Sequence, residues 1–207
     1  MSRVSTPYEA TGRSGQKART RAALVDAARL LVARGVTPTV AEAAETAGVS
    51  RAAAYRYFPD QRRLLEAAHP ETGATTMLGP NPPRDPARRL DEVVDNFTTM
   101  IIDTEPQQRT MLRLSLGGDP TARGGLPLRQ GRAIAWIGEA LEPLAGEGLT
   151  PAQIHRLALA VRSAIGIEAL VWLIDVGGLD RDEAVESMRW SAQAVLSAAR
   201  SGRAPPS

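Results

Sequence analysis

The stretch TVAEAAETAGVSRAAAYRYFPDQRRLL, residues 39–65, contains the signals that decide the fold. Thr39 followed by Glu42 forms a capping box, which predicts a short helix that ends at Gly48. Ser50 is a suitable N-cap for a second short helix, RAAAYRYF, and a Pro-Asp pair then ends that helix and starts QRRLLEAA. The glycine allows a tight turn between the two short helices. A small helix projected in this way fits the DNA major groove.

The regions on either side predict a small head and a larger body. Short helices are marginal alone, so they need a helix before and after them to pack against. Apolar residues at helical spacing predict the preceding helix, and a proline-rich stretch separates the head from a further series of helical patterns. The predicted division is a flexible arm (1–15), a head (16–69), a linker (70–85), a helical body (86–200) and a flexible tail (201–207).

The composition favours an all-α fold. Ala, Leu and Arg dominate, hydrophobic residues make up 43% of the chain and aromatic residues only 4%. These dominant residues lose little conformational freedom in a helix. We find no alternating strand pattern and no internal repeat. The body pattern predicts helices from Pro86, after Pro106, over 127–145, over 151–176 and over 180–200, with the loop GGDPTARGG between the second and the third. The whole chain is therefore expected to hold about nine helices.

The residue types present argue against an enzyme, and we expect no catalytic residue, metal or cofactor. The chain has no cysteine and only two histidines, His69 and His155. This excludes a disulfide framework and a thiol nucleophile, and it leaves too few ligands for a histidine metal site. The motifs of zinc proteases, serine hydrolases and P-loop proteins are absent from the sequence. No apolar run approaches the length of about 20 residues that a membrane span needs, so we expect a cytoplasmic protein with no membrane partner.

Charge is unevenly distributed along the chain. Residues 1–63 carry eleven Lys or Arg against five Asp or Glu, a net charge of +6, whereas the remaining residues carry fourteen against eighteen, a net charge of −4. A basic end on a slightly acidic body is compatible with binding to a polyanion such as DNA. A solvated charged surface explains the same pattern equally well.

At residues 16–69 the order TVAEAAETAGVS, RAAAYRYF, PDQRRLL resembles the signature of the TetR family of transcriptional regulators. The resemblance implies a three-helix DNA-binding head on a helical body that dimerises and often holds an inducer cavity. It implies that Arg51 faces bases, where Arg can read guanine bidentately, although a phosphate contact is the alternative. The DNA-binding residues implied in this way are Thr39, Ser50, Arg51, Ala52, Ala53, Tyr55, Arg56, Tyr57 and Gln61.

Three positions depart from the family pattern. Gln61 stands where a lysine is usual, so it brings no charge to a phosphate. Ala54 replaces a larger aliphatic residue, although Ala54 and Phe58 are still expected in the core. Pro70 cuts the fourth helix short, and that helix connects cavity and head in the family. The basic residues of the arm and first helix, Arg13, Lys17, Arg19 and Arg21, could reach DNA or remain without a specific role.

In the body, the resemblance implies a homodimer through the last two helices. Ala164 and Gly166 would permit close approach, and the last helix carries the stripe Val185, Met188, Ala192, Val195 and Ala199; a buried core helix of a monomer is the alternative. A small-molecule effector is implied too. The candidate ligand-binding residues are Phe97, Met100, Met111, Arg113, Trp136, Arg162, Glu168 and Trp172. These apolar side chains could equally be plain core, and Glu168 could pair with Arg162 or with the other subunit.

The function that follows is a sequence-specific DNA-binding transcriptional regulator, a repressor released from a palindromic operator by a small ligand. An activator, or a regulator without any ligand, would have the same sequence features. An enzyme is the third alternative.

Overall fold

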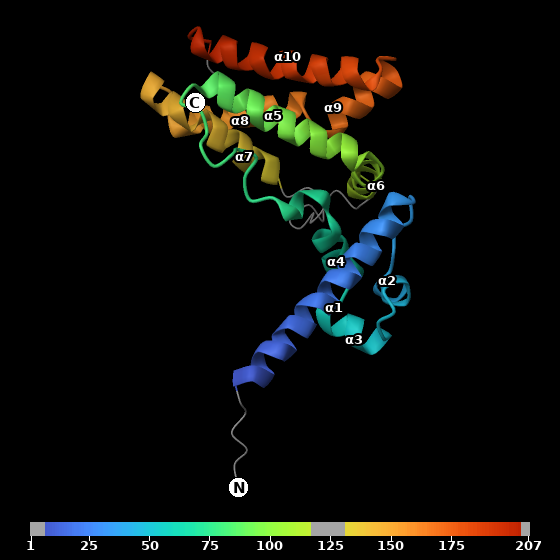
Figure 1. Ribbon diagram of the computed structural model, residues 1–207. Coiled ribbons are helices and arrows are strands. Elements are labelled where there is room, and N and C mark those ends of the chain that lie inside the picture. The colour runs from blue at the N-terminus through green and yellow to red at the C-terminus, as the bar shows by residue number, and fades with distance from the viewer. Residues whose placement is uncertain (1–6, 117–130, 204–207) are drawn as a thin grey trace.

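The computed structural model describes residues 7–116 and 131–203, with side chains from residue 14 onward. Within these residues the chain forms helices and no strand, so the expected all-α class is confirmed (Figure 1). Parts of four expectations lie outside the described residues: the first six residues of the arm, the side chain of Arg13, the region 117–130 with the GGDPTARGG loop, and the end of the tail.

The head consists of the first four helices, and their small residues allow close packing. Buried residues from all four helices form one core cluster, with Leu24 and Leu64 among its large side chains and Ala43, Ala44 and Ala54 among its small ones. The bounds are α1 (Pro7–Ala33), α2 (Val40–Thr46), α3 (Arg51–Tyr57) and α4 (Gln61–Ala68).

The first helix is longer than the sequence indicated. α1 begins at Pro7, whereas a flexible arm was expected up to residue 15. Apolar periodicity did not show this part of the helix, and its described side chains, those of residues 14–19, are all exposed. Proline suits the first turn of a helix, and the Ala, Gln, Lys and Arg residues that follow are good helix formers. Figure 1 shows this end of α1 projecting beyond α3.

The segment between head and body follows the surface of the body closely. After the short 3-10 helix η1 (Pro70–Gly73), residues 74–85 run over the body without a helix. Trp136 Nε1 donates to the Thr75 carbonyl at 3.1 Å, and Asn96 donates to the Met77 carbonyl at 2.8 Å. The side chains of Met77 and Leu78 are buried in the body core. The linker is therefore part of the packed body.

The body is a bundle in which α5 lies between α10 and α7 (Figure 1). Its core includes Leu90 and Phe97 of α5, Ile137 of α7, Leu157 of α8 and Leu196 of α10. The bounds are α5 (Pro86–Asp103), α6 (Glu105–Leu116), α7 (Arg132–Leu141), the 3-10 helix η3 (Glu142–Glu147), α8 (Pro151–Ala164), α9 (Ile167–Val171), the π-helical turn η4 (Trp172–Val176) and α10 (Arg181–Arg200).

The helix expected to run without interruption over residues 151–176 is broken. α8 ends at Ala164, and Gly166 has a φ of 129°, a conformation that side chains other than glycine rarely adopt. A Cβ at this position would also meet the guanidinium of Arg162. Gly166 thus makes a kink, where the sequence suggested a close approach between helices of two subunits.

This same stretch contradicts the expectation that no run is apolar enough to span a membrane. Pro151–Val176 has the length and the mean hydropathy, 1.9, of a membrane span, and 39% of the apolar window is buried. A core helix of a globular protein has the same features. The break at Gly166 and the packing of Leu157 and Leu170 in the body core favour the core-helix interpretation.

α6 connects the body to the head through polar contacts on both sides. Toward the head, Thr110 Oγ1 donates to the Val32 carbonyl at 3.3 Å and Arg113 donates to the Gly35 carbonyl at 3.1 Å. Toward the rest of the body, Glu105 accepts a hydrogen bond from Arg181 of α10 at 2.9 Å, and within α6 it accepts one from Arg109 at 2.7 Å. Burial alone would raise the pKa of Glu105, but these two arginines outweigh it and keep the pKa below its ordinary value. α6 is therefore fixed to both domains.

Candidate nucleic-acid interface and effector cavity

Two capped helices and the turn between them form a helix-turn-helix in the head. Thr39 accepts a hydrogen bond from the Glu42 backbone N–H at 3.2 Å, and the Glu42 carboxylate accepts from the Thr39 N–H at 2.7 Å, which completes the capping box. Gly48 has a φ of 64°, as a sharp turn requires. Ser50 accepts from the Ala53 N–H at 3.3 Å and so starts α3. The hydrogen bond from the Thr39 backbone N–H, together with the one from the Thr39 hydroxyl, lowers the pKa of Glu42 below its ordinary value.

The recognition helix α3 separates a buried side from an exposed side. Ala54 is fully buried and Phe58 is 2% exposed, so the expectation that both lie in the core is confirmed. Arg51, Ala52, Tyr55 and Arg56 are exposed, while Ala53 and Tyr57 are partly buried. Tyr57 packs against the head core. The exposed set is what a helix needs in order to reach bases and phosphates from a fixed support.

Two residues predicted to contact DNA have hydrogen-bond partners within the head. The Gln61 side chain donates to the Thr37 carbonyl at 3.4 Å and to the Pro38 carbonyl at 3.0 Å. In the structure without DNA, its amide therefore holds the loop before α2. The Thr39 hydroxyl donates to the Glu42 carboxylate at 2.8 Å. Thr39 remains exposed at the start of α2, but its side chain already serves the cap.

Basic residues continue along α1 beside the recognition helix. Lys17 and Arg19 are exposed on the projecting end of α1. The guanidinium of Arg21 lies over the Phe58 ring, 5.3 Å from its centroid, in a cation–π contact. Arg21 therefore supports the head core from outside, a role that the sequence pattern did not indicate.

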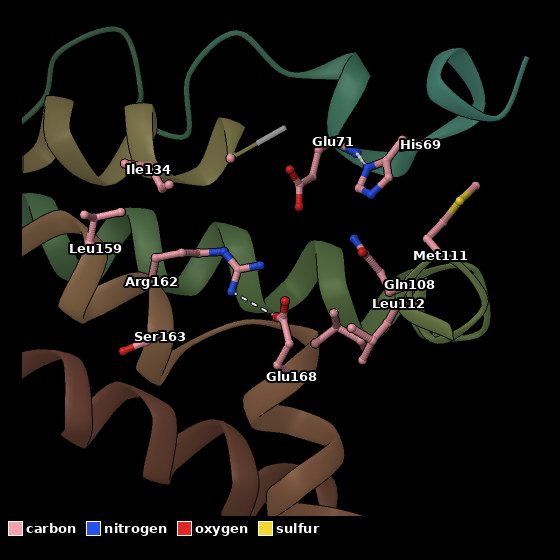
Figure 2. A pocket seen from close by; sticks show the side chains of 12 residues that line it. His69, Glu71, Gln108, Met111, Leu112, Ile134, Leu159, Arg162, Ser163 and Glu168 are labelled. Carbon is pink, nitrogen blue, oxygen red and sulfur yellow. Dashed lines mark hydrogen bonds and ion pairs between the residues drawn. The ribbon is translucent and has the colours of Figure 1, made fainter. Parts of the chain in front are cut away.

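A second candidate site is a cavity of about 450 Å³ between the head and the body. Figure 2 shows its lining side chains, which come from the end of α4, η1, α6, α7, α8 and α9. Volumes of this order are typical of small-molecule sites. The lining residues are His69, Glu71, Gln108, Met111, Leu112, Gly131, Ile134, Leu159, Arg162, Ser163, Ile167 and Glu168.

Three of the eight predicted ligand-binding residues line this cavity. They are Met111, Arg162 and Glu168, and the suggested pairing of Arg162 with Glu168 is present at 3.1 Å. Arg113 contacts the head, as described above. Trp172 is 64% exposed on the surface.

The other three apolar candidates belong to the body core. Phe97 and Trp136 are buried edge-to-face at 6.0 Å, and Met100 packs against the same cluster. The Trp136 N–H is already used by the linker. Helical periodicity marks such residues as inward-facing but cannot tell a core from a cavity wall.

The sequence analysis missed His69, Glu71 and Gln108 as a polar group in the cavity wall. His69 is 5% exposed, Glu71 is 8% exposed and Gln108 is 3% exposed. His69 Nδ1 accepts from the Glu71 N–H at 3.3 Å. Burial raises the pKa of Glu71, and this effect exceeds the opposing influence of Arg162 and Arg132. The break at Pro70 was the available signal, since it turns the chain away from α4 and into the cavity.

Glu71→Gln should stabilise the protein at pH 7 and not at pH 4. The folded state raises the pKa of Glu71, so the folded protein holds this proton more tightly than the unfolded chain does. Stability is consequently lost as pH rises from the unfolded value of about 4.3 through the folded value. Glutamine has no such penalty, and the gain should be on the order of 1 kcal/mol, the cost of one poorly paired buried group.

Urea unfolding at both pH values measures this gain, with Glu186→Gln on the exposed side of α10 as the matched control. An equal effect of Glu71→Gln at both pH values would contradict the assigned burial of the charged carboxylate.

The head of this protein is similar in sequence to the heads of known regulatory proteins. The model for bacterial regulatory proteins of the tetR family matches residues 23–68. The HTH-type transcriptional repressor LfrR of Mycolicibacterium smegmatis is 43% identical over 54 residues, which are 26% of this chain and 29% of that protein. The match thus spans less than a third of the length of this curated relative.

Solved structures extend the likeness to the body. A TetR-family transcriptional regulator from Rhodococcus sp. aligns with a TM-score of 0.63 at 22% identity, over 86% of this chain and 99% of that one. TylP, a TetR regulator from Streptomyces fradiae, aligns with a TM-score of 0.58 at 20% identity, over 89% of this chain and 87% of that one. At these identities the likeness shows the fold of the body.

The capped helix pair forms a helix-turn-helix in the head, and the body is a helical bundle. The head matches the family model and the whole fold matches family structures. The likeness to the tetR family therefore holds for the head by sequence, over residues 23–68, and for the rest of the described chain by fold.

Proposed function

We propose that this protein is a sequence-specific DNA-binding transcriptional regulator, and specifically a repressor that a small molecule releases from a palindromic operator. The observation that carries the proposal is the exposed side of α3, where Arg51, Ala52, Tyr55 and Arg56 project from a head of the TetR type. The positive charge of the N-terminal third supports it. Such a role places the protein in the cytoplasm, with the DNA.

In this proposal Arg51 reads a base and Tyr55 contacts the backbone. Both residues are exposed at adjacent turns of α3, whereas Tyr57 is partly buried and holds the helix in place. Arg56 adds charge toward phosphates. Ser50, Ala52 and Ala53 lie at the start of the helix, the part that approaches base edges in helix-turn-helix proteins.

We further propose a homodimer through the last two helical segments. Trp172 and Val176 of η4 are each 64% exposed and Trp190 of α10 is 73% exposed. Large exposed apolar side chains of this kind are typical of contact surfaces. The stripe expected to form the interface is not available for it, because Met188, Ala192 and Ala199 pack in the core of their own protomer. We therefore propose that Trp172 and Trp190, and not this stripe, form the dimer interface.

Selection from random double-stranded DNA tests the proposal. A two-fold symmetric dimer should enrich inverted repeats whose half-sites lie about 34–36 Å apart, or a multiple of that distance. Enrichment of single half-sites would support DNA reading and contradict the dimer. Absence of any enriched sequence with folded protein would contradict the regulator function.

A further inference from the structure

The cavity holds one buried donor that nothing in the protein satisfies. Among the described residues, Gln108 Nε2 is the buried side-chain nitrogen or oxygen atom without a hydrogen-bond partner. Gln108 is only 3% exposed, and Figure 2 shows its amide directed to the space below Glu71 and His69. An unsatisfied buried donor is costly, so its retention points to a partner supplied from outside.

The cavity also holds one carboxylate whose charge is not matched by an ion pair. Glu71 donates its backbone N–H to His69 Nδ1. Among the hydrogen bonds and ion pairs of residues 14–116 and 131–203, none involves the Glu71 carboxylate. Arg162 and Arg132 both act on this carboxylate through their charge. Of the two, Arg162 lines the cavity and already donates to the Ile165 carbonyl at 2.9 Å and to Glu168 at 3.1 Å. Its guanidinium also lies over the Phe97 ring, 5.6 Å from the centroid.

The remaining wall is apolar. Met111, Leu112, Ile134 and Ile167 complete the lining, and the charged lining residues Glu71, Glu168 and Arg162 give a formal charge of −1. Among the described lining residues, an anionic ligand would meet the carboxylates of Glu71 and Glu168, and the lining arginine, Arg162, is already paired with Glu168. A cation with an apolar body would offset the uncompensated charge and cover the apolar wall.

We propose that this cavity binds an amphipathic organic cation whose ammonium donates to the Glu71 carboxylate and whose hydrogen-bond acceptor receives the Gln108 amide. Its apolar part lies against Met111, Leu112, Ile134 and Ile167. The inference deepens the proposed function, because it names the chemical class of the effector.

Both polar contacts belong to elements that hold the DNA-binding head. Glu71 lies in η1, directly after α4, and Arg29 of α1 donates to the Ala68 carbonyl at 3.3 Å at the same place. Gln108 lies on α6, two residues before Thr110, which bonds to the end of α1. A ligand that draws Glu71 and Gln108 together therefore acts on α4 and α6 at once, and it can favour one position of the head over another.

Titration calorimetry without DNA tests the ligand class. The probes are decylamine and decanoate, below their micelle-forming concentrations, which share an apolar chain and differ in the sign of the charged group. A third probe, 10-amino-1-decanol, adds a hydroxyl as acceptor. The expected result is that the two amines bind wild type at least about tenfold more tightly than decanoate does, and that Glu71→Gln removes this preference. Gln108→Leu should remove any gain that the hydroxyl gives.

Two controls keep the outcome clear. Glu186→Gln changes an exposed carboxylate of α10 and should leave all affinities unchanged. Urea unfolding shows whether each variant is folded. Equal affinity for decylamine and decanoate, or an unchanged amine preference in folded Glu71→Gln, overturns the proposal. Because these titrations contain no DNA, a negative result would not bear on the proposed regulator function. Conversely, a failure to bind operator DNA would not bear on the proposed ligand class.

Discussion

Arg51→Ala should weaken binding to the operator by about tenfold to a hundredfold, because a bidentate arginine–guanine contact is worth about 1–3 kcal/mol of discrimination. Arg51 is the first residue of α3 and is exposed, while Ala54 and Phe58 fix the helix from the buried side. The loss should be confined to operator DNA and to the base pair that Arg51 reads. Competition binding against operators changed at one position at a time measures both effects.

Arg51→Lys separates base reading from phosphate contact. Lysine keeps the charge but lacks the fork that matches guanine bidentately, so the lysine variant should also lose the base preference. Arg88→Ala, which removes an exposed arginine from α5 in the body, is the matched control and should have no effect. If Arg51→Ala weakened binding to all DNA equally, Arg51 would be a phosphate contact and the base-reading role would be wrong.

Trp190→Asp should convert the dimer to a monomer. Trp190 is 73% exposed on α10, and a tryptophan at the centre of an interface commonly contributes about 2 kcal/mol or more, which is at least a thirtyfold change in the dissociation constant of the dimer. A buried carboxylate at the same place adds to the cost. Operator affinity should fall with dimerisation, since the monomer contacts one half-site.

Analytical ultracentrifugation at several concentrations measures the change in dimerisation. Leu30→Asp introduces the same charge at an exposed leucine of α1, outside the proposed interface, and should remain dimeric. A Trp190→Asp protein with an unchanged dimer dissociation constant would show that the dimer, if present, uses another surface.

The head could be predicted almost completely from the sequence, because its signals are local. The caps at Thr39 and Ser50 and the turn at Gly48 each depend on residues within a few positions. The hydrogen-bond partners of Gln61 within the head could not be predicted, because they are distant in the sequence. The hydrogen bonds of Gln61 span 23 and 24 residues, and no spacing rule identifies such partners.

The body was predicted as a set of helices but not as a surface. The stripe on the last helix is real, yet periodicity does not say whether it faces its own protomer or a second one. Trp190 lies outside that stripe and was overlooked for this reason. Likewise, Gly166 reads as a small residue within an apolar helix, and only its φ of 129° shows that it ends α8.

The cavity was the least predictable part, because its wall combines residues far apart in the chain. His69 and Glu71 follow α4, Gln108 comes from α6, and Arg162 comes from α8. Polar residues at such separations meet only after the head has docked on the body.

The central claim is that α3 reads a specific DNA sequence. Fluorescence anisotropy with the selected DNA and with a scrambled DNA of equal length, across a salt series, tests it most directly. We predict a dissociation constant of about 10⁻⁸–10⁻¹¹ M for the selected DNA, at least about a thousandfold tighter than for the scrambled DNA, and affinity for both that falls with salt as phosphate contacts require. Equal affinity for the two DNAs, or no binding by a folded dimer, would contradict the account.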